Sequence, residues 1–175
     1  MPFIKFRDVP EPFGKRLAIA ETPENPWLEP NCYGTALFLM GILPHDVCIY
    51  NKHVPKLLKL LDEVEELKDN SLVFSLREKE DEKYIEHLAY VRSVNPFEGF
   101  QRTGCCGSFE QIKSMQGIRA YLDVIFPKFS TWCPNVAKNP VKWVNGVYIL
   151  PEDKSKREEL NNLAREIIEG YSPSG

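Results

Sequence analysis

The sequence lacks a strong net charge and a long apolar run, and each absence excludes a class of protein. Its 175 residues carry 22 basic and 25 acidic side chains, for a formal net charge of -3. Such a balance provides no field that would attract nucleic acid or an anionic membrane, so neither is predicted as a partner. Near Cys32, the longest apolar stretch runs from Ala36 to Leu43 with one glycine inside. It is too short to span a bilayer.

Cysteine pairs with the C-x-x-C spacing are absent as well. The sequence has an odd number of cysteines, five in all. They are Cys32, Cys48, Cys105, Cys106 and Cys133. Structural zinc sites commonly draw their ligands from such pairs, so no metal and no other cofactor is predicted. The first ten residues, MPFIKFRDVP, have no apolar signal core. We therefore expect reduced thiols in a cytoplasmic protein.

The length fits a single domain over residues 1–175, in three parts. Residues 1–30 hold six prolines and are predicted to form an arm that wraps the domain, with a short strand at Leu17–Ala20. Residues 31–107 form the expected core and carry the candidate site. Residues 108–175 add an accessory helix, a hairpin and a final helix.

Three segments have clear helical signals. Asn31 can cap a helix that runs to about Gly41, and its apolar residues on every face predict that it is buried at the centre. Residues 54–68 place their apolar side chains on one stripe, which predicts a second helix. Ser155 and Glu158 form a capping box for a last helix.

Strand signals lie between the second and the last of these helices. Residues 71–76 and Tyr84–Val94 are predicted strands, separated by a charged loop at residues 77–83. Asn95-Pro96 predicts a turn, after which residues 98–103 can return as an antiparallel partner.

The C-terminal third has mixed signals. Ser108 with Gln111 suggests a capping box for a helix within residues 108–126, although Gly117 weakens the pattern and the tail could be extended. Asn145-Gly146 between two apolar runs predicts a hairpin. The whole order predicts an α+β domain with helices on one side of an antiparallel sheet.

Cys32 stands at the start of the predicted buried helix, in the stretch Asn31-Cys32-Tyr33-Gly34. The helix dipole and the unpaired N–H groups of a first turn favour a thiolate, so this position predicts a lowered thiol pKa. A thiolate is a nucleophile suited to acyl transfer. Gly34 removes bulk two residues on, which would let a substrate carbonyl approach.

A nucleophilic cysteine needs a base, and His87 is the best of three histidines. His45 and His53 fall in the connection between the first two helices and are predicted to be surface or capping residues. Alternation along the strand puts His87 on one face with Ala89 and Val91. This compact apolar face is expected to pack on the buried helix.

Gln101 is the candidate third group, which would hold the imidazole ring. A loop of about five residues around Asn95-Pro96 is an ordinary hairpin length, and it would place His87 opposite Gln101. The even spacing of these two residues keeps them on the same side of the sheet.

These residues carry a resemblance. The stretch from Asn31 to Gly107, about 75 of the 175 residues, resembles the NlpC-type branch of the papain-like cysteine peptidases and amidases. That branch has a cysteine in a turn that opens a buried helix, then a strand, then a strand that begins with histidine, then a strand with a polar residue. The matching segments are Asn31 to Gly34, Asp69 to Phe74, His87 to Val91 and Gly99 to Gly104.

The resemblance implies a papain-like domain with Cys32 as nucleophile, His87 as general base and Gln101 in the third, polar position. It implies a cysteine hydrolase or acyltransferase that acts on an amide bond of a small peptide or γ-glutamyl substrate. Three departures are present: Asn31 and Ser71 stand where aspartate is common, and Gln101 has no charge to stabilise an imidazolium.

Two alternatives stay open. The chain could be a catalytically inactive binding module that keeps the papain-like fold. It could also be a thiol redox or metal protein that uses the vicinal Cys105 and Cys106, which lie between two glycines.

Overall fold

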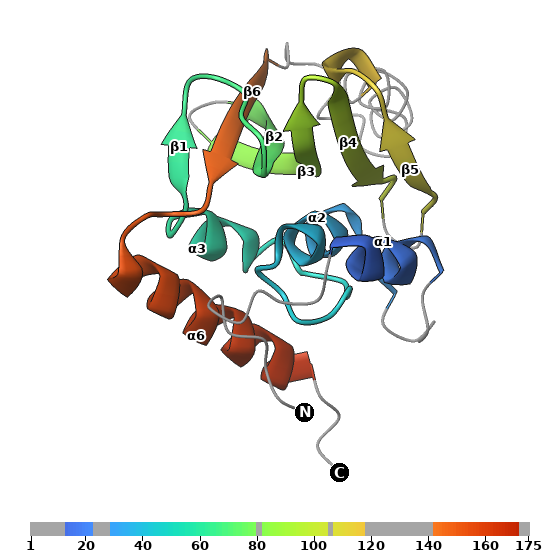
Figure 1. The fold of residues 1–175 in the computed structure, drawn as a ribbon. Helices are drawn as coiled ribbons and strands as arrows, with labels where there is room; N and C mark the ends of the chain where they lie inside the picture. Colours follow the sequence, from blue (N-terminus) through green and yellow to red (C-terminus); the bar gives the residue numbers. More distant parts are fainter. Residues whose placement is uncertain (1–12, 23–28, 80–81, 105–106, 118–141, 172–175) are drawn as a thin grey trace.

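The computed structural model describes residues 13–22, 29–79, 82–104, 107–117 and 142–171, which form an antiparallel sheet with helices on one of its faces (Figure 1). The six strands, in the spatial order β1-β6-β2-β3-β4-β5, are β1 (Asp62–Val64), β2 (Ser71–Lys79), β3 (Glu82–Val94), β4 (Phe97–Arg102), β5 (Phe109–Ile112) and β6 (Lys142–Ile149). The helices are α1 (Phe13–Glu21), α2 (Cys32–Met40), α3 (Val54–Leu58) and α6 (Lys154–Tyr171). The predicted α+β class is confirmed.

The central helix α2 follows the sequence signals closely. The Asn31 side chain accepts a hydrogen bond from the Gly34 N–H at 2.9 Å and caps the helix start. Gly41 ends the helix with a φ of 91°, a left-handed conformation that glycine adopts without strain. All nine residues of α2 are buried, as its uniformly apolar sequence predicts.

Residues 13–21 form α1, so the predicted strand at Leu17–Ala20 is wrong. Arg16 and Ala20 are four residues apart and both buried, which is the spacing of one helical face. The Arg16 guanidinium donates to the main-chain oxygens of Phe38 and Leu43, at 2.6 and 3.0 Å. The helix therefore directs both residues to the core.

The second predicted helix, residues 54–68, is much shorter than expected. Its α3 portion ends at Leu58, and residues 62–64 become strand β1. β1 pairs antiparallel with β6, with Glu63 opposite Tyr148. The main-chain pairing with a distant strand overrides the local helical pattern.

The predicted loop at residues 77–83 is also wrong. The β2–β3 ladder continues from Ser71 opposite Val91 to Lys79 opposite Glu82. The charged residues therefore extend both strands instead of separating them, with a register shift between Ser75 and Leu76.

The capping box at Ser108 and Gln111 does not open a helix. Residues 109–112 form β5, which pairs antiparallel with β4. The predicted hairpin at Asn145-Gly146 is wrong as well, since β6 runs straight through it. The residue opposite Gly146 is Phe74, and a Cβ on Gly146 would lie 2.0 Å from the Phe74 ring. The glycine makes room for an aromatic side chain here instead of forming a turn.

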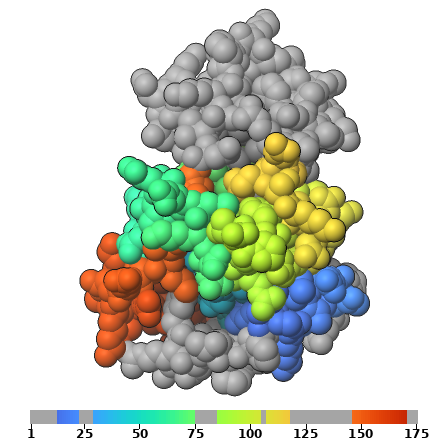
Figure 2. Space-filling view, turned by 45° about the horizontal axis from the view of Figure 1, so that its top comes forward, coloured from blue at the N-terminus to red at the C-terminus, as the bar shows by residue number. Residues whose placement is uncertain are grey.

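The last predicted helix is present as α6, which packs an apolar face on the core through buried Leu160, Ala164, Ile167 and Ile168. Its cap differs from the expected Ser155, because the Asp153 side chain accepts from the Lys156 N–H at 3.0 Å. In the space-filling view, α6 (orange-red) and α1 (blue) lie on opposite sides of the molecule (Figure 2). None of the helices described here is long and apolar enough to cross a membrane.

The two faces of the sheet carry separate apolar clusters. Leu88, Tyr90 and Phe100 belong to the large cluster that includes the helices. Ala89 and Val91 belong to a small cluster that contains no residue of α1, α2, α3 or α6. The strand face shared by His87, Ala89 and Val91 was expected to pack on the buried helix, and this expectation is wrong: α2 packs on the alternate residues of β3.

Candidate active site

The first two residues of α2 contact β3 on both sides of His87. The backbone N–H of Leu88 is hydrogen-bonded to the Cys32 thiol. The Tyr33 hydroxyl donates to the main-chain oxygen of Ile85 at 2.6 Å. The start of the helix is therefore attached to the segment that bears the histidine.

The thiol reaches β3 near the place where the β3–β4 ladder ends. That ladder runs from Val94 opposite Phe97 to Tyr90 opposite Phe100, and Leu88 lies beyond it. The backbone N–H of Leu88 favours the Cys32 thiolate, so the sulfur lies close to β3 at this point.

His87 and Gln101 are in direct contact, as predicted. The His87 Nε2 lies 2.8 Å from the Gln101 Oε1, and both residues are only 1% exposed. The assumed register is nevertheless wrong. Asn95-Pro96 forms a two-residue turn, and Tyr90 pairs with Phe100, so continuing this register puts Ala89 opposite Gln101. A shift of two residues preserves the face of each side chain, so the predicted contact forms diagonally.

A third contact determines the orientation of the Gln101 amide. The Gln101 Nε2 donates to the Glu110 Oε2 at 3.2 Å. A carboxylate only accepts, so the amide nitrogen faces Glu110 and the amide oxygen faces the ring. The proton of the neutral imidazole is then on Nε2, and the buried Nδ1 carries the lone pair. Sequence reasoning missed Glu110 because the Ser108 and Gln111 pattern suggested a helix start where β5 forms.

Burial holds both titratable groups in their neutral forms. It raises the pKa of the Cys32 thiol to about 12, against the opposing effect of the N–H groups of Leu88, Tyr33 and Cys32 itself. It also lowers the pKa of the His87 imidazole to about 4, against the opposing hydrogen bond to Gln101. The expected lowering of the thiol pKa is therefore wrong, because loss of solvation outweighs the helix start.

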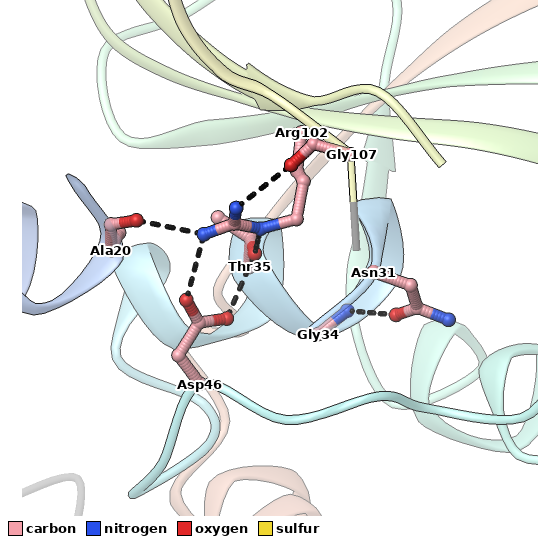
Figure 3. Close-up of polar contacts among 7 residues, drawn as sticks. All are labelled: Ala20, Asn31, Gly34, Thr35, Asp46, Arg102 and Gly107. Carbon is pink, nitrogen blue, oxygen red and sulfur yellow. Dashed lines mark hydrogen bonds and ion pairs between the residues drawn. The ribbon is translucent and has the colours of Figure 1, made fainter. Parts of the chain in front are cut away.

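The departure at Asn31 has a structural explanation. The side-chain oxygen accepts from the N–H of Gly34 (Figure 3) and from that of Ile49, at 2.9 and 3.2 Å. The side-chain nitrogen donates to the Ile49 main-chain oxygen at 2.8 Å. An aspartate could not make this last bond, since an ionised carboxylate has no donor.

Gly34 also has a different role from the one predicted. A Cβ there would lie 1.5 Å from the main-chain oxygen of Val47. The glycine therefore lets the loop after α2 approach the helix. The space that the missing side chain leaves is filled by the protein's own backbone.

A second polar cluster lies one helical turn further along α2 (Figure 3). We call it the arginine cluster: Arg102, Asp46 and Thr35, all buried. The Arg102 guanidinium donates to the Thr35 hydroxyl at 2.8 Å and to the Asp46 carboxylate at 3.3 Å. It also donates to the main-chain oxygens of Ala20 and Gly107. No local sequence pattern predicted this cluster.

Cys105 and Cys106, the basis of the redox or metal alternative, lie outside the described residues. Within the described ranges, no group of three or more His, Cys, Asp and Glu side chains could hold a metal ion. No family model, curated protein or solved structure matches this chain. We call Cys32, His87 and Gln101 the thiol–imidazole cluster.

Proposed function

We propose that this protein is a cysteine hydrolase or acyltransferase that acts on an amide bond, with a papain-like domain of the NlpC type. Cys32 is the nucleophile, His87 the general base and Gln101 the residue that orients the imidazole. One observation carries the proposal. The first two residues of α2 contact β3 on both sides of His87, and the imidazole is bonded to Gln101.

The first chemical step joins Cys32 to the substrate. The sulfur forms a bond to the amide carbonyl carbon while the thiol proton moves to the lone pair on His87 Nδ1. The carbonyl electron pair moves to the oxygen, and the backbone N–H of Cys32 is the natural donor to this oxyanion. Because burial keeps both partners neutral, proton transfer accompanies the attack instead of preceding it.

The second step releases the amine. The C–N bond breaks, the imidazolium returns its proton to the leaving nitrogen, and a thioester remains on Cys32. Water then attacks the thioester with His87 as base, which gives the carboxylic acid and the free thiol. An amine in place of water would give acyl transfer. Peptide and γ-glutamyl amides are the substrate class proposed.

A second candidate function is a catalytically inactive binding module with the same fold. The observation that favours it is burial: Cys32 is 6% exposed, and His87 and Gln101 are 1% exposed. Burial also opposes the ionised form of both the thiol and the imidazole. In this case the three residues are buried core groups.

The two functions are separated by covalent chemistry at Cys32. A panel of peptide and γ-glutamyl amides and thioesters is incubated with the protein, and intact mass reports an acyl adduct. Cys32→Ala should abolish the adduct and lower turnover by at least about a thousandfold. Cys48→Ala is the matched control, since Cys48 is a partly exposed cysteine that forms no disulfide within the described residues. Turnover that survives in Cys32→Ala contradicts the proposal, and a wild type that forms no adduct at any pH favours the binding module.

A further inference from the structure

We propose that Glu110 is a positioning residue of the thiol–imidazole cluster, acting on His87 through the Gln101 amide. This inference rests on the proposed function. The glutamine in the third position has no charge, and Glu110 on β5 supplies one. The sequence patterns did not indicate that β5 belongs to the site.

The register of the sheet brings the two side chains together. Gln101 on β4 pairs directly with Glu110 on β5, so both point from the same face of the sheet. Their side chains join through the 3.2 Å bond from the Gln101 Nε2 to the Glu110 Oε2. With the 2.8 Å contact of His87, this makes a continuous chain of polar contacts from a carboxylate to the imidazole.

Glu110 has an orienting effect on this chain. An amide can rotate by half a turn and present its NH₂ group to the ring instead of its oxygen. The ring would then carry its proton on Nδ1, the nitrogen that has to receive the thiol proton. The carboxylate opposes this rotation because it accepts only from the NH₂ group.

Glu110 also has an electrostatic effect. A negative charge behind the amide favours the imidazolium that forms when the thiol gives up its proton. Glu110 is exposed, so solvent weakens this effect. A hydrogen bond through an amide transmits part of the charge that a carboxylate in direct contact would supply.

Two variants separate the two effects. Glu110→Gln removes the charge but keeps an acceptor for the Gln101 amide, whereas Glu110→Ala removes both. Glu98→Gln and Glu98→Ala are the matched controls. Glu98 lies on the neighbouring strand β4, and its carboxylate pairs with Arg92 at 3.5 Å. Both glutamates are at least partly exposed, so all four variants are expected to fold.

The readout is the ¹⁵N chemical shifts of the His87 ring, which distinguish the two neutral tautomers without any substrate. In Glu110→Ala, the Nδ1-protonated tautomer should appear and kcat/KM should fall about tenfold. In Glu110→Gln, the tautomer should persist, while the imidazole pKa should fall by about half a unit and kcat/KM by about threefold. The two Glu98 controls should match the wild type.

The outcomes also separate this inference from the proposed function. If Glu110→Ala leaves the ring tautomer and the kinetics equal to those of Glu98→Ala, while Cys32 forms an acyl adduct, the role of Glu110 is refuted and the proposed function stands. If the tautomer changes but Cys32 never forms an adduct in the wild type, the positioning contact is supported and the proposed function fails.

Discussion

The thiol–imidazole cluster and the arginine cluster are neighbours that share two elements, α2 and β4. Cys32 and Thr35 lie one turn apart on α2, and Gln101 and Arg102 are consecutive on β4. Both clusters are buried. They differ in how they compensate for the free-energy cost of burying polar groups.

The arginine cluster contains a buried ion pair. The two charges of Arg102 and Asp46 face each other, the Thr35 hydroxyl donates to the same carboxylate at 2.8 Å, and main-chain oxygens take the other guanidinium donors. Burial raises the pKa of Asp46, and the bonds from Thr35 and Arg102 oppose this effect. Such a matched set links α1, α2 and β4 and leaves no group ready for chemistry.

The thiol–imidazole cluster, in contrast, contains two titratable groups that burial keeps neutral. In the proposed function, a proton passes between them without a net change of charge in the cluster. The difference separates a buried polar cluster that stabilises the fold from a second one, a turn away on the same helix, to which we assign proton transfer.

The largest effect is expected from Arg102→Met. The substitution leaves the Asp46 carboxylate buried without its cation, which should lower the free energy of unfolding by about 3–5 kcal/mol. Arg92→Met is the control, because Arg92 forms an exposed pair with Glu98 at 3.5 Å and should cost at most about 1 kcal/mol. Urea unfolding measures both. Equal costs would show that the arginine cluster is not a structural link.

A smaller effect is expected from pH. Burial lowers the pKa of His87 from an ordinary 6.5 to about 4. Between these values the unfolded chain binds more protons than the folded chain, so stability should rise with pH and be lost as pH falls. At about 1.4 kcal/mol per unit, the loss from pH 7 to pH 4 is at most about 3 kcal/mol.

His87→Gln isolates this contribution. Its urea midpoints should change less between pH 4 and pH 7 than those of the wild type, since a glutamine does not titrate. Arg102→Met should change the slope through Asp46 instead, because loss of the cation raises the pKa of this buried carboxyl further. Parallel wild-type and His87→Gln curves would mean that His87 is not held neutral by burial.

The smallest effect is expected at Gln101. Gln101→Ala leaves the His87 Nε2–H buried without its acceptor, which should cost about 1–3 kcal/mol of stability. Acyl transfer should fall about ten- to a hundredfold, because cysteine needs less help from a third residue than serine. Gln101→His should retain activity, since histidine can also bond the ring. Rates that are equal in the wild type and Gln101→Ala would remove Gln101 from the site.

Local patterns predicted the parts of the fold whose causes are local. In α2, Asn31 caps the start, the apolar run after it predicts burial, and Gly41 ends the helix. Parity predicted the contact of His87 with Gln101, but the turn by itself would not have preserved it. The register shift between Val91 and Ser93 restores the even spacing that keeps the two side chains on one face.

Other features depend on partners that are far away in the sequence. The pairing of β1 with β6 joins residues 62–64 to residues 147–149 and turned a helical pattern into a strand. Arg102 finds Asp46 and Thr35 at separations of 56 and 67 residues. Glu110 reaches Gln101 only because residues 109–112 form a strand and not a helix.

The ionisation of the Cys32 thiol depends on both the local sequence and the tertiary structure. The sequence by itself determined that the thiol stands at the start of a capped, apolar helix, where backbone N–H groups favour the thiolate. Only the tertiary structure decided that this helix start lies against β3 and that the sulfur is withdrawn from water. Desolvation acts on the whole charge, whereas a few N–H dipoles compensate for part of it, and so the thiol stays protonated.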